Sequence, residues 1–465
     1  MSKARAKASA SWSIGPTDAP LPPQVPGLPI LGNALSMASK PTRSMVDWAV
    51  AHGPVFRLKL LHKTAYVLAG ADAYRFASAS KYEVLSNHET FISTIRELGS
   101  DKNLAVLSGE DHRLFRSIAQ DGYKRTAMMR SLPVVTSTMR KFTDSLAEGE
   151  TFEVFSVFQR LISLELGESI ANVEVDDTIG ELQRFMRYLM NAHIVGVWPK
   201  WTRYLPSIRR SIRVSHQVVG DVVRYHQENP PGAASNGGSG EGRDRGLIDD
   251  FLDAHAKDPE RVPMAAVKAA AFGPFLAGQD TVAATTAFML FALYAAPALL
   301  ERVQADVDAL YANGMPKGPD FKNARALLDA TRETLRRYPV APFVPKTTLC
   351  EFEFKGHRIP AGAQVYLFQT LPHFLPENYP DPWAFDIDRP RAGPGTFAPF
   401  GSGPHMCIGA GMGELQVAAN VASLLHFGEF EMTPADYVLK NRAIPLSPAG
   451  FKLRLKRKNP APVAP

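Results

Sequence analysis

The chain has 465 residues, of which 45% are hydrophobic and 21% are charged. Such a composition is typical of a globular protein with enough apolar surface for a large core, and it excludes disorder over most of the length. The 52 basic and 46 acidic residues leave a net charge of +6. This charge suits an acidic partner, but no zinc-finger or other nucleic-acid module accompanies it, so we expect an acidic protein and no nucleic acid.

Two cysteines, Cys350 and Cys407, cannot build a disulfide framework, which favours a reducing, cytoplasmic setting. The N-terminus is basic and rich in Ser and Ala but has no apolar run of signal-peptide length. No stretch of about 18 consecutive apolar residues occurs elsewhere, so the sequence predicts no membrane span. An organelle transit peptide stays open as an alternative at the N-terminus.

The first part of the chain predicts an extended lead-in and then a small sheet. Six prolines lie between residues 16 and 33, and we expect residues 1–21 to form a flexible extension. Alternating residues in Val55–Leu61 and Ala65–Leu68 predict two short strands. From about Ala71 to Leu310 the spacing of apolar residues is helical.

Two features stand out in this helical region. His112 and Arg116 lie four apart on one helical face, for which a solvent-facing basic helix is the default interpretation. Residues 229–246 form a Gly, Ser and Pro tract that cannot bury enough apolar surface to order itself. We interpret the tract as a surface loop within one fold, because the helical pattern resumes directly after it; a domain linker is the alternative.

An apolar helix is predicted over Ala271–Thr286, with Gly278, Asp280 and Thr281 in its middle. Polar groups in such a helix need a partner or a purpose. The simplest explanation is a core helix whose threonine bonds back to a carbonyl, with Asp280 paired to an arginine elsewhere in the chain. Pro274 should kink this helix, because proline lacks the amide hydrogen that the helical ladder requires.

Glu333 and Arg336 lie three apart on a helix that ends before Pro339, so their side chains share a face. Such a pair is usually a solvated surface ion pair. After Arg337, short strands are predicted at Phe352–Phe354 and Gln364–Phe368, and a long helix from about Gly409 to Leu425. The total predicts a mainly α protein with a minor β region.

One loop carries the strongest chemical signal. Residues 397–411 place four glycines around Cys407, directly before the last helix. A ligand cysteine must be deprotonated, and backbone amides in a glycine-rich turn and at a helix N-terminus stabilise the anion. A small buried cysteine at a glycine-rich turn is the structural alternative.

The spacing of the loop resembles the haem-binding signature of the cytochrome P450 family, with its marked positions at Phe400, Gly403, His405, Cys407 and Gly409. The resemblance implies haem b, iron protoporphyrin IX, between this loop and the helix around Gly278. Cys407 would be the metal ligand, an arrangement that favours O–O cleavage. Phe400 would pack near the sulfur, Gly403 and Gly409 would allow close approach, and His405 would donate to a haem propionate.

Three further motifs agree with the family and imply other roles. The pair Glu333 and Arg336, with Arg389 as a third partner, would form a buried network that holds the cysteine loop. Gly278, Asp280 and Thr281 resemble the oxygen-activation motif, in which the acid and the alcohol relay protons. His112 and Arg116 would contact haem propionates, and Lys346 would stand where the family commonly supplies an arginine. The histidine at position 112 favours a soluble, bacterial type.

The resemblance implies one catalytic domain over residues 22–465, with residues 229–246 as a surface loop. The activity would be monooxygenation of a lipophilic terpenoid, steroid or fatty acid by a monomer. Pocket walls would come from about Phe91–Leu104, Phe185–Trp201, Phe272–Ala277 and Val340–Val344. No flavin or nicotinamide motif is evident, so NAD(P)H would act only indirectly, through a reductase and a ferredoxin or flavodoxin.

The electron donor would be acidic and would dock near Arg113, Lys124 and Arg125. The alternative for these three residues is that they are ordinary solvated charges. Three other functions stay open for the whole chain: a peroxide-driven peroxygenase, a haem-thiolate enzyme with non-oxidative chemistry, and a non-catalytic haem sensor.

Overall fold

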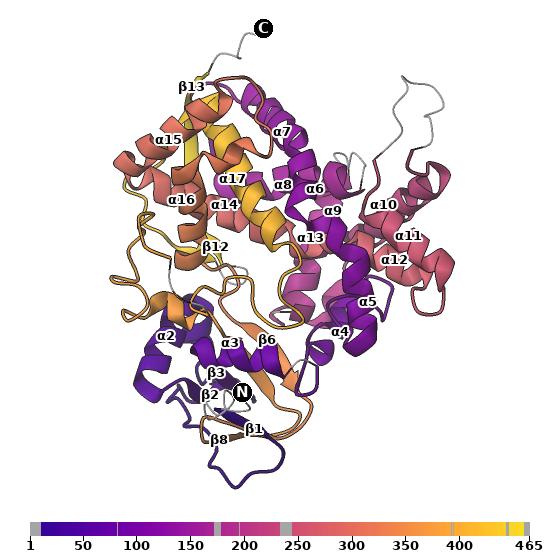
Figure 1. The fold of residues 1–465 in the computed structure, drawn as a ribbon, viewed down its shortest axis with the longest axis vertical. Coiled ribbons are helices and arrows are strands. Elements are labelled where there is room, and N and C mark those ends of the chain that lie inside the picture. Colours follow the sequence, from indigo (N-terminus) through magenta and orange to yellow (C-terminus); the bar gives the residue numbers. More distant parts are fainter. Residues whose placement is uncertain are drawn as a thin grey trace, which may run out of the picture. The chain divides into compact units, whose positions relative to one another are not determined.

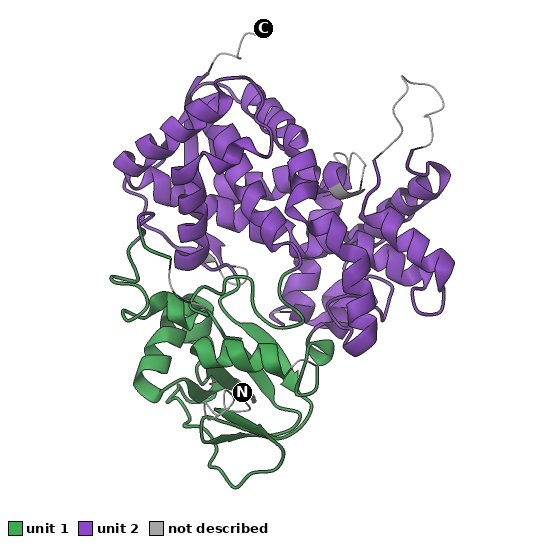
Figure 2. Ribbon diagram, viewed as in Figure 1, with its two compact units in different colours: residues 1–90, 341–384, 389–407 green, residues 91–340, 385–388, 408–465 purple. Residues whose placement is uncertain are grey.

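A computed structural model describes residues 11–459, except 81, 172–177, 195, 233–243, 392, 394 and 443–445. The contacts divide the chain into two compact units, shown in Figure 2. Unit 1 comprises residues 1–90, 341–384 and 389–407, and unit 2 comprises residues 91–340, 385–388 and 408–465. The single catalytic domain expected from the sequence stays a prediction.

Unit 1 is built on a five-stranded sheet of order β2-β3-β9-β6-β4. Strands β2 and β3, which the alternation of their residues predicted, pair antiparallel, while β3 and β9 pair parallel. In β3, Tyr66 and Leu68 enter one hydrophobic cluster and Val67 enters another, so both faces of the sheet are buried. The strands are β2 (Val55–Leu60), β3 (Lys63–Ala69), β4 (Leu85–Ser86), β6 (Val344–Thr348) and β9 (Gln364–Phe368).

The remaining elements of unit 1 are short. Its helices are α1 (Ala34–Ser39), α2 (Pro41–His52), α3 (Gly70–Ala79) and the 3-10 turn η6 (Leu371–Phe374). A three-stranded sheet of order β1-β7-β8 joins β1 (Trp12–Ile14), β7 (Phe352–Phe354) and β8 (His357–Ile359). Helix α4 (His88–Glu97) begins in unit 1 and ends in unit 2.

The expectation of a flexible extension over residues 1–21 is wrong for its second half. Residues 1–10 lie outside the described residues, but Trp12–Ile14 pairs antiparallel with Phe352–Phe354. The Trp12 ring packs against Phe76 with 5.6 Å between the ring centroids. An aromatic anchor and a strand partner far along the chain therefore order this segment, and neither could be seen in the local sequence.

Unit 2 is mainly helical, as the sequence predicted for this region (Figure 1). Its strands are β5 (Thr151–Glu153), β10 (Gly428–Met432), β11 (Asn441–Arg442), β12 (Ser447–Pro448) and β13 (Lys452–Lys458), in sheets of order β10-β13-β5 and β11-β12. Its helices, in chain order, are α5 (Gly109–Ala119), η1 (Gln120–Tyr123), α6 (Arg125–Arg130), α7 (Leu132–Ser145), α8 (Val154–Ala171), α9 (Ile179–Leu189), η3 (Met190–Ile194), η4 (Lys200–Tyr204), α10 (Pro206–Glu228), α11 (Leu247–Lys257), α12 (Met264–Ala271), α13 (Gly273–Ala277), α14 (Gln279–Tyr294), α15 (Pro297–Tyr311), η5 (Asp320–Lys322), α16 (Arg325–Arg337) and α17 (Ala410–Phe427).

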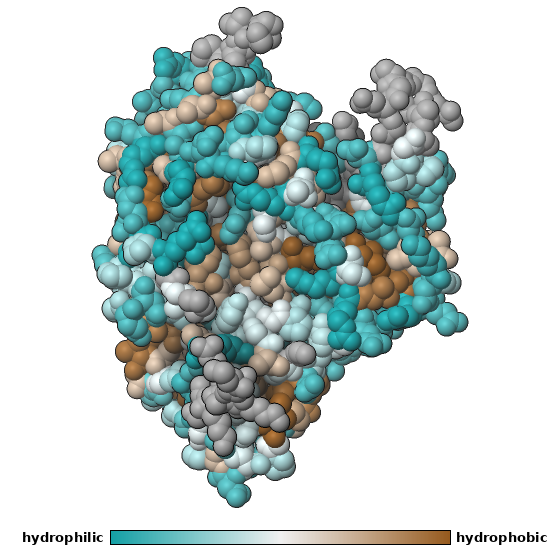
Figure 3. Space-filling view, in the orientation of Figure 1, coloured by the Kyte–Doolittle hydropathy of each residue, from teal (hydrophilic) through white to brown (hydrophobic). Residues whose placement is uncertain are grey.

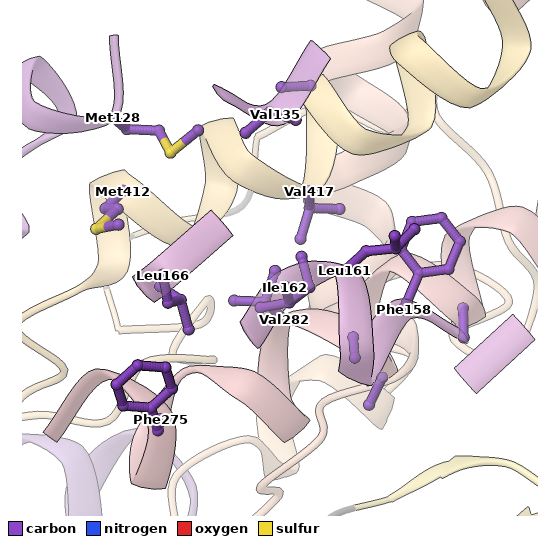
Figure 4. Packing of buried hydrophobic residues seen from close by; sticks show 14 of the residues in the cluster. Met128, Val135, Phe158, Leu161, Ile162, Leu166, Phe275, Val282, Met412 and Val417 are labelled. Carbon is purple, nitrogen blue, oxygen red and sulfur yellow. The ribbon is translucent and has the colours of Figure 1, made fainter. Parts of the chain in front are cut away.

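The core of unit 2 lies among α7, α8, α14 and α17, which belong to one large cluster of buried apolar residues. Figure 4 shows Ile162 and Leu166 of α8, Val282 of α14 and Val417 of α17 among these buried side chains. Twelve of the sixteen residues of α14 are buried, which explains why this helix shows no amphipathic pattern. The long final helix that the sequence predicted is α17.

The residues Gly273–Tyr294 are, within the described part of the chain, the one stretch apolar and long enough to cross a membrane. The window is 67% buried inside the protein, as in the core helix of a globular domain. Most of residues 229–246, the predicted surface loop, lie outside the described residues. On the face drawn in Figure 3, hydrophilic residues cover most of the surface, with smaller hydrophobic areas between them.

Candidate functional site

The cysteine loop of unit 1 is a closed turn held by its own backbone. The amide of Cys407 donates to the Phe400 carbonyl at 2.9 Å, and the amide of Met406 donates to the Gly403 carbonyl at 3.0 Å. The Cys407 side chain is exposed, so a metal ion can reach its sulfur. Two residues later Gly409 caps α17, an 18-residue helix, so the positive end of the helix dipole follows the cysteine closely in the chain.

Gly403 is required at its position in this loop. Its φ is +74°, a conformation that side chains rarely adopt, and a Cβ added there would lie 2.4 Å from the carbonyl oxygen of Ala77 in α3. The glycine therefore lets the loop approach the end of α3 as closely as it does. The structure thus gives Gly403 a role in the contact with the backbone of α3. The close approach to haem that the sequence implied for Gly403 and Gly409 stays a prediction.

Two histidines of unit 1 belong to the surroundings of the loop. The His405 ring meets the Tyr82 ring edge to face, with 5.8 Å between the centroids. His373 is fully buried, and its Nε2 accepts a hydrogen bond of 2.9 Å from the amide of Ala398, where the loop begins. Sequence reasoning missed His373, because it lies 25 residues before Ala398 and belongs to no motif.

Lys346 lies on β6 in unit 1 and is buried, with 7% of its surface exposed. Desolvation lowers the pKa of Lys346 to about 8, and it is the only cause of the shift. Burial of a cation is unfavourable without an anionic partner, and no acidic side chain of the described residues contributes one. A haem propionate would supply this missing negative charge.

In unit 2, α5 carries His112 and Arg116 on one face, as the spacing predicted. His112 is fully buried and Arg116 is partly buried, so this face is not the solvent-facing surface of the default interpretation. Asp111, on another side of α5, forms an ion pair of 2.8 Å with Arg261. A buried imidazole beside a guanidinium is chemically suited to hold carboxylates.

The long apolar helix of unit 2 is interrupted twice. It is interrupted at Phe272, two residues before Pro274, and again at Gly278, so it forms the three segments α12, α13 and α14. A Cβ at Gly278 would lie 2.6 Å from the Pro274 carbonyl oxygen, which explains the glycine. The sequence predicted a kink at Pro274, and the structure has a one-residue interruption at Phe272, two residues earlier; Phe272 and Gly278 both keep helical φ and ψ values.

The two polar residues after the second break are held by different partners. Thr281 Oγ donates to the carbonyl of Ala277 at 2.7 Å, as the core-helix explanation proposed. Asp280 Oδ1 accepts hydrogen bonds from the side-chain amides of Gln159, at 2.6 Å, and Gln279, at 3.1 Å. Sequence reasoning missed Gln159, which lies 121 residues earlier, on α8.

Glu333 and Arg336 form a buried ion pair on α16, and not the exposed pair that such spacing usually gives. Arg336 Nη2 lies 2.7 Å from Glu333 Oε1, and only 2% and 5% of the two side chains are exposed. The amide of Asp386 also donates to Glu333 Oε1, at 3.0 Å. Arg389 donates to the carbonyls of Pro380, Asp381 and Ala384; its membership of the Glu333 network stays a prediction.

The predicted site residues divide between the two units. Unit 1 holds Phe400, Gly403, His405 and Cys407 in one loop, together with Lys346 and Arg389 elsewhere in the unit. Unit 2 holds the others: His112, Arg116, Gly278, Asp280, Thr281, Glu333, Arg336 and Gly409.

The donor set fits haem. One accessible thiolate suits an iron atom whose equatorial ligands come from a porphyrin. The buried cation Lys346 suits a propionate, as described above. Within the described residues, no group of three or more His, Cys, Asp or Glu side chains could hold a metal ion. These features define the class of protein, a haem-thiolate protein.

Residues 22–453 match the family model described as Cytochrome P450, and the chain therefore belongs to the cytochrome P450 family. Its cofactor is haem with a cysteine thiolate ligand, and it is an enzyme of the P450 monooxygenase family. The prediction of the family from the cysteine loop is confirmed.

Among curated proteins, the chain is 24% identical over 442 residues to the cyclooctat-9-en-7-ol 5-monooxygenase of Streptomyces melanosporofaciens, covering 88% of this chain and 91% of the relative. It is 25% identical over 398 residues to the sterol 14alpha-demethylase of Mycolicibacterium vanbaalenii, covering 82% and 84%. The solved structure of retinoic acid-bound cyanobacterial CYP120A1 matches with a TM-score of 0.78 at 18% identity, covering 95% of this chain and all of the other. The last likeness confirms the predicted mainly helical P450 fold.

Proposed function

We propose that the chain inserts one atom of O₂ into a C–H bond of a lipophilic terpenoid or steroid-like molecule, with electrons from a separate redox protein. The reaction consumes substrate, O₂, two electrons and two protons, and it yields the hydroxylated product and water. The haem supplies the iron at which O₂ is activated. The residues of the chain hold the cofactor, orient the substrate and supply protons.

The break at Gly278 is the observation that carries the proposal. A carboxylate and a hydroxyl, Asp280 and Thr281, follow it at the start of a helix that is mainly apolar and mostly buried. A non-catalytic haem sensor has no need of such a pair, whereas cleavage of O₂ consumes two protons that must reach a dry site. We assign Asp280 to proton uptake and Thr281 to proton transfer next to the break.

The substrate class is supported by the names of the relatives and by apolar side chains of unit 2 in the segments expected to form the pocket walls. The names mention cyclooctat-9-en-7-ol, a sterol and retinoic acid, all of which are lipophilic. Of the aromatic residues expected in the pocket walls, Phe185 and Phe272 pack against each other with 5.8 Å between ring centroids and are fully buried. Phe91 and Leu104 are only partly buried and are better candidates for substrate contact.

Isotope labelling separates this proposal from the peroxygenase alternative. With NADPH, a ferredoxin, its reductase and ¹⁸O₂, we expect one ¹⁸O atom in the product of retinoic acid or of a terpene alcohol that perturbs the haem spectrum. Product formation with hydrogen peroxide alone, at the same rate and without need of NADPH, would contradict the proposal. Titration of the protein with the same lipids, followed by the haem spectrum and without any oxidant, measures binding separately from turnover.

The electron donor is proposed to be an acidic ferredoxin or flavodoxin that docks near the end of α5. Arg113 and Lys124 are more than half exposed there, and Arg125 begins α6. Glu110 and Asp121 lie within 4 Å of Arg113 and Lys124 and weaken the local positive charge. Reversal of Arg113 and Lys124 to glutamate should slow reduction by the ferredoxin and flatten its salt dependence. An unchanged rate and salt dependence would show that these are ordinary surface charges.

A further inference from the structure

Asp280 is turned toward α8 and is held by two side-chain amides, one from α8 and one from its own neighbour in the chain. Gln159 of α8 donates from Nε2 to Asp280 Oδ1 at 2.6 Å, and Gln279 donates from Nε2 to the same oxygen at 3.1 Å. No hydrogen bond within the described residues engages Oδ2. Both donors therefore fix one carboxylate oxygen and leave the other available for a proton.

A second residue of α8 fixes the orientation of the Gln279 amide. Ser163 is fully buried, and its Oγ lies 2.7 Å from Gln279 Oε1 and 2.7 Å from the carbonyl oxygen of Gln159. The single hydroxyl proton can go to either acceptor. When it goes to Gln279, it holds the amide oxygen at α8 and so turns the NH₂ group toward Asp280.

We propose that Gln159, Ser163 and Gln279 form an amide clamp that positions the Asp280 carboxylate for proton transfer. This inference rests on the proposed function, in which Asp280 takes up protons. The clamp is made of positioning residues and not of catalytic ones, because none of the three needs to exchange a proton itself.

The chemistry of the clamp suits a group that must be protonated and deprotonated in turn. Both donors are uncharged amides, and both use Oδ1, so a proton can join and leave Oδ2 without breaking either hydrogen bond. A guanidinium or ammonium partner would oppose each protonation through its charge. The clamp thus fixes the direction of the carboxylate without adding a fixed charge beside it.

The clamp is needed because the helix alone does not aim Asp280. Successive residues of a helix point about 100° apart, so Asp280 and Thr281 diverge from the same break. Thr281 is fixed by its bond to the Ala277 carbonyl. Asp280 depends on α8, which packs against α14 through residues such as Ile162, Leu166 and Val282 (Figure 4).

Two substitutions of Gln159 test the clamp on the holoenzyme with retinoic acid as the probe. Gln159→Leu keeps the size and removes the donor, and we expect kcat to fall by about tenfold with KM changed less than twofold. Gln159→Glu places a second carboxylate at hydrogen-bond distance, and two such groups share a proton. We therefore expect its kcat to depend on pH with an inflection shifted to higher pH.

Infrared spectroscopy adds a readout that does not depend on turnover. In the substrate-free ferric protein, the Asp280 carboxyl band is the band that disappears in Asp280→Asn. We expect Gln159→Leu and Ser163→Ala to shift the frequency of this band, because they remove or misdirect donors to it. Ser163→Ala removes only one hydroxyl group. It is therefore the variant for the infrared measurement if Gln159→Leu does not fold.

Gln304 provides a matched control. On the exposed face of α15 its Nε2 donates to Asp308 Oδ1 at 2.8 Å, a glutamine–aspartate pair of the same chemistry. Gln304→Leu should leave kcat, the pH profile and the Asp280 band as in the wild type.

The outcomes separate the clamp from the proposed function. If Asp280→Asn slows turnover but the Gln159 variants keep wild-type kinetics, pH profile and band position, the clamp is wrong and the proton relay stands. If Asp280→Asn itself turns over like the wild type, the assignment of proton uptake to Asp280 fails, and the clamp fails with it. A change in melting temperature alone, with an unchanged pH profile and band, would mean a purely structural role and would overturn the inference.

Discussion

Glu165 is a carboxylic acid without any exposed surface, on the α8 helix. Asn420 and Gln416 of α17 donate to its Oε2 at 3.0 and 2.8 Å. Desolvation outweighs these hydrogen bonds and raises the pKa of Glu165 from 4.5 to about 7. The folded protein therefore holds a neutral or easily neutralised carboxyl in the packing of α8 against α17.

This shift predicts a pH dependence of stability. The pKa is raised in the folded state, so the stabilising contribution of neutral Glu165 is complete below pH 4.5 and is lost as the pH rises through about 7. The difference between 4.5 and about 7 corresponds to at most about 3 kcal/mol. The free energy of unfolding of Glu165→Gln should not show this decline with rising pH. At pH 8 the variant should therefore unfold at a higher denaturant concentration than the wild type.

Urea denaturation at several pH values between 4.5 and 8 measures the effect, with Glu301→Gln, at an exposed position of α15, as the control. Identical pH dependence of the wild type and Glu165→Gln would contradict the assignment of a raised pKa to Glu165.

Substitution of two glycines in the cysteine loop distinguishes the effect of backbone strain from that of a steric clash. Gly401 and Gly403 have φ values of +77° and +74°, but a Cβ at Gly401 meets nothing within 4 Å, whereas one at Gly403 meets the Ala77 carbonyl. Gly401→Ala should reduce stability by about 1 kcal/mol through strain. Gly403→Ala should reduce it by several kcal/mol in addition to lowering haem content, because the loop must move away from α3.

Thermal unfolding together with the haem absorbance per protein tests the comparison. Equal losses in the two variants would show that the contact with Ala77 does not hold the loop.

At the scale of elements, the sequence predicted those features whose residues are neighbours in the chain. The cysteine loop and α17 are neighbours in the chain, and β2 with β3 form a hairpin, so spacing and alternation identify them. The partners of β1, of Asp280 and of Ala398 lie 340, 121 and 25 residues away, and they carry ordinary residue types. Tertiary packing alone brings Gln159 to Asp280 and His373 to the cysteine loop.

Helix α16 offers a prediction at this scale. Glu333→Ala would leave Arg336 as a buried charge without its main partner, and loss of one partner of a buried ion pair typically lowers stability by about 3–5 kcal/mol. Guanidinium denaturation should show a midpoint well below that of the wild type.

The matched control is Arg302→Ala, which breaks the exposed pair of Arg302 with Asp388. That pair is equally short, with 2.7 Å between nitrogen and oxygen, but it is solvated, so we expect little change. A loss at Glu333 no larger than that at Arg302 would contradict the structural role of the buried pair.

At the scale of the whole molecule, the family match over residues 22–453 ties the motifs together. Residues 397–407 of the cysteine loop belong to unit 1, and helices α5, α8 and α14 belong to unit 2. Each unit contains residues that the sequence analysis assigned to haem binding. The amount of haem that the protein retains therefore depends on the residues of both units. The cytoplasmic location and the monomeric state stay predictions.

The most direct test of the account is the spectrum of the reduced protein with carbon monoxide. Ligation by the Cys407 thiolate predicts a strongly red-shifted Soret band in the wild type. Cys407→Ala should lose this band, while the control Cys350→Ala, at the other cysteine of the chain, should keep it. Retention of the red-shifted band in Cys407→Ala would contradict the assignment of Cys407 as the iron ligand.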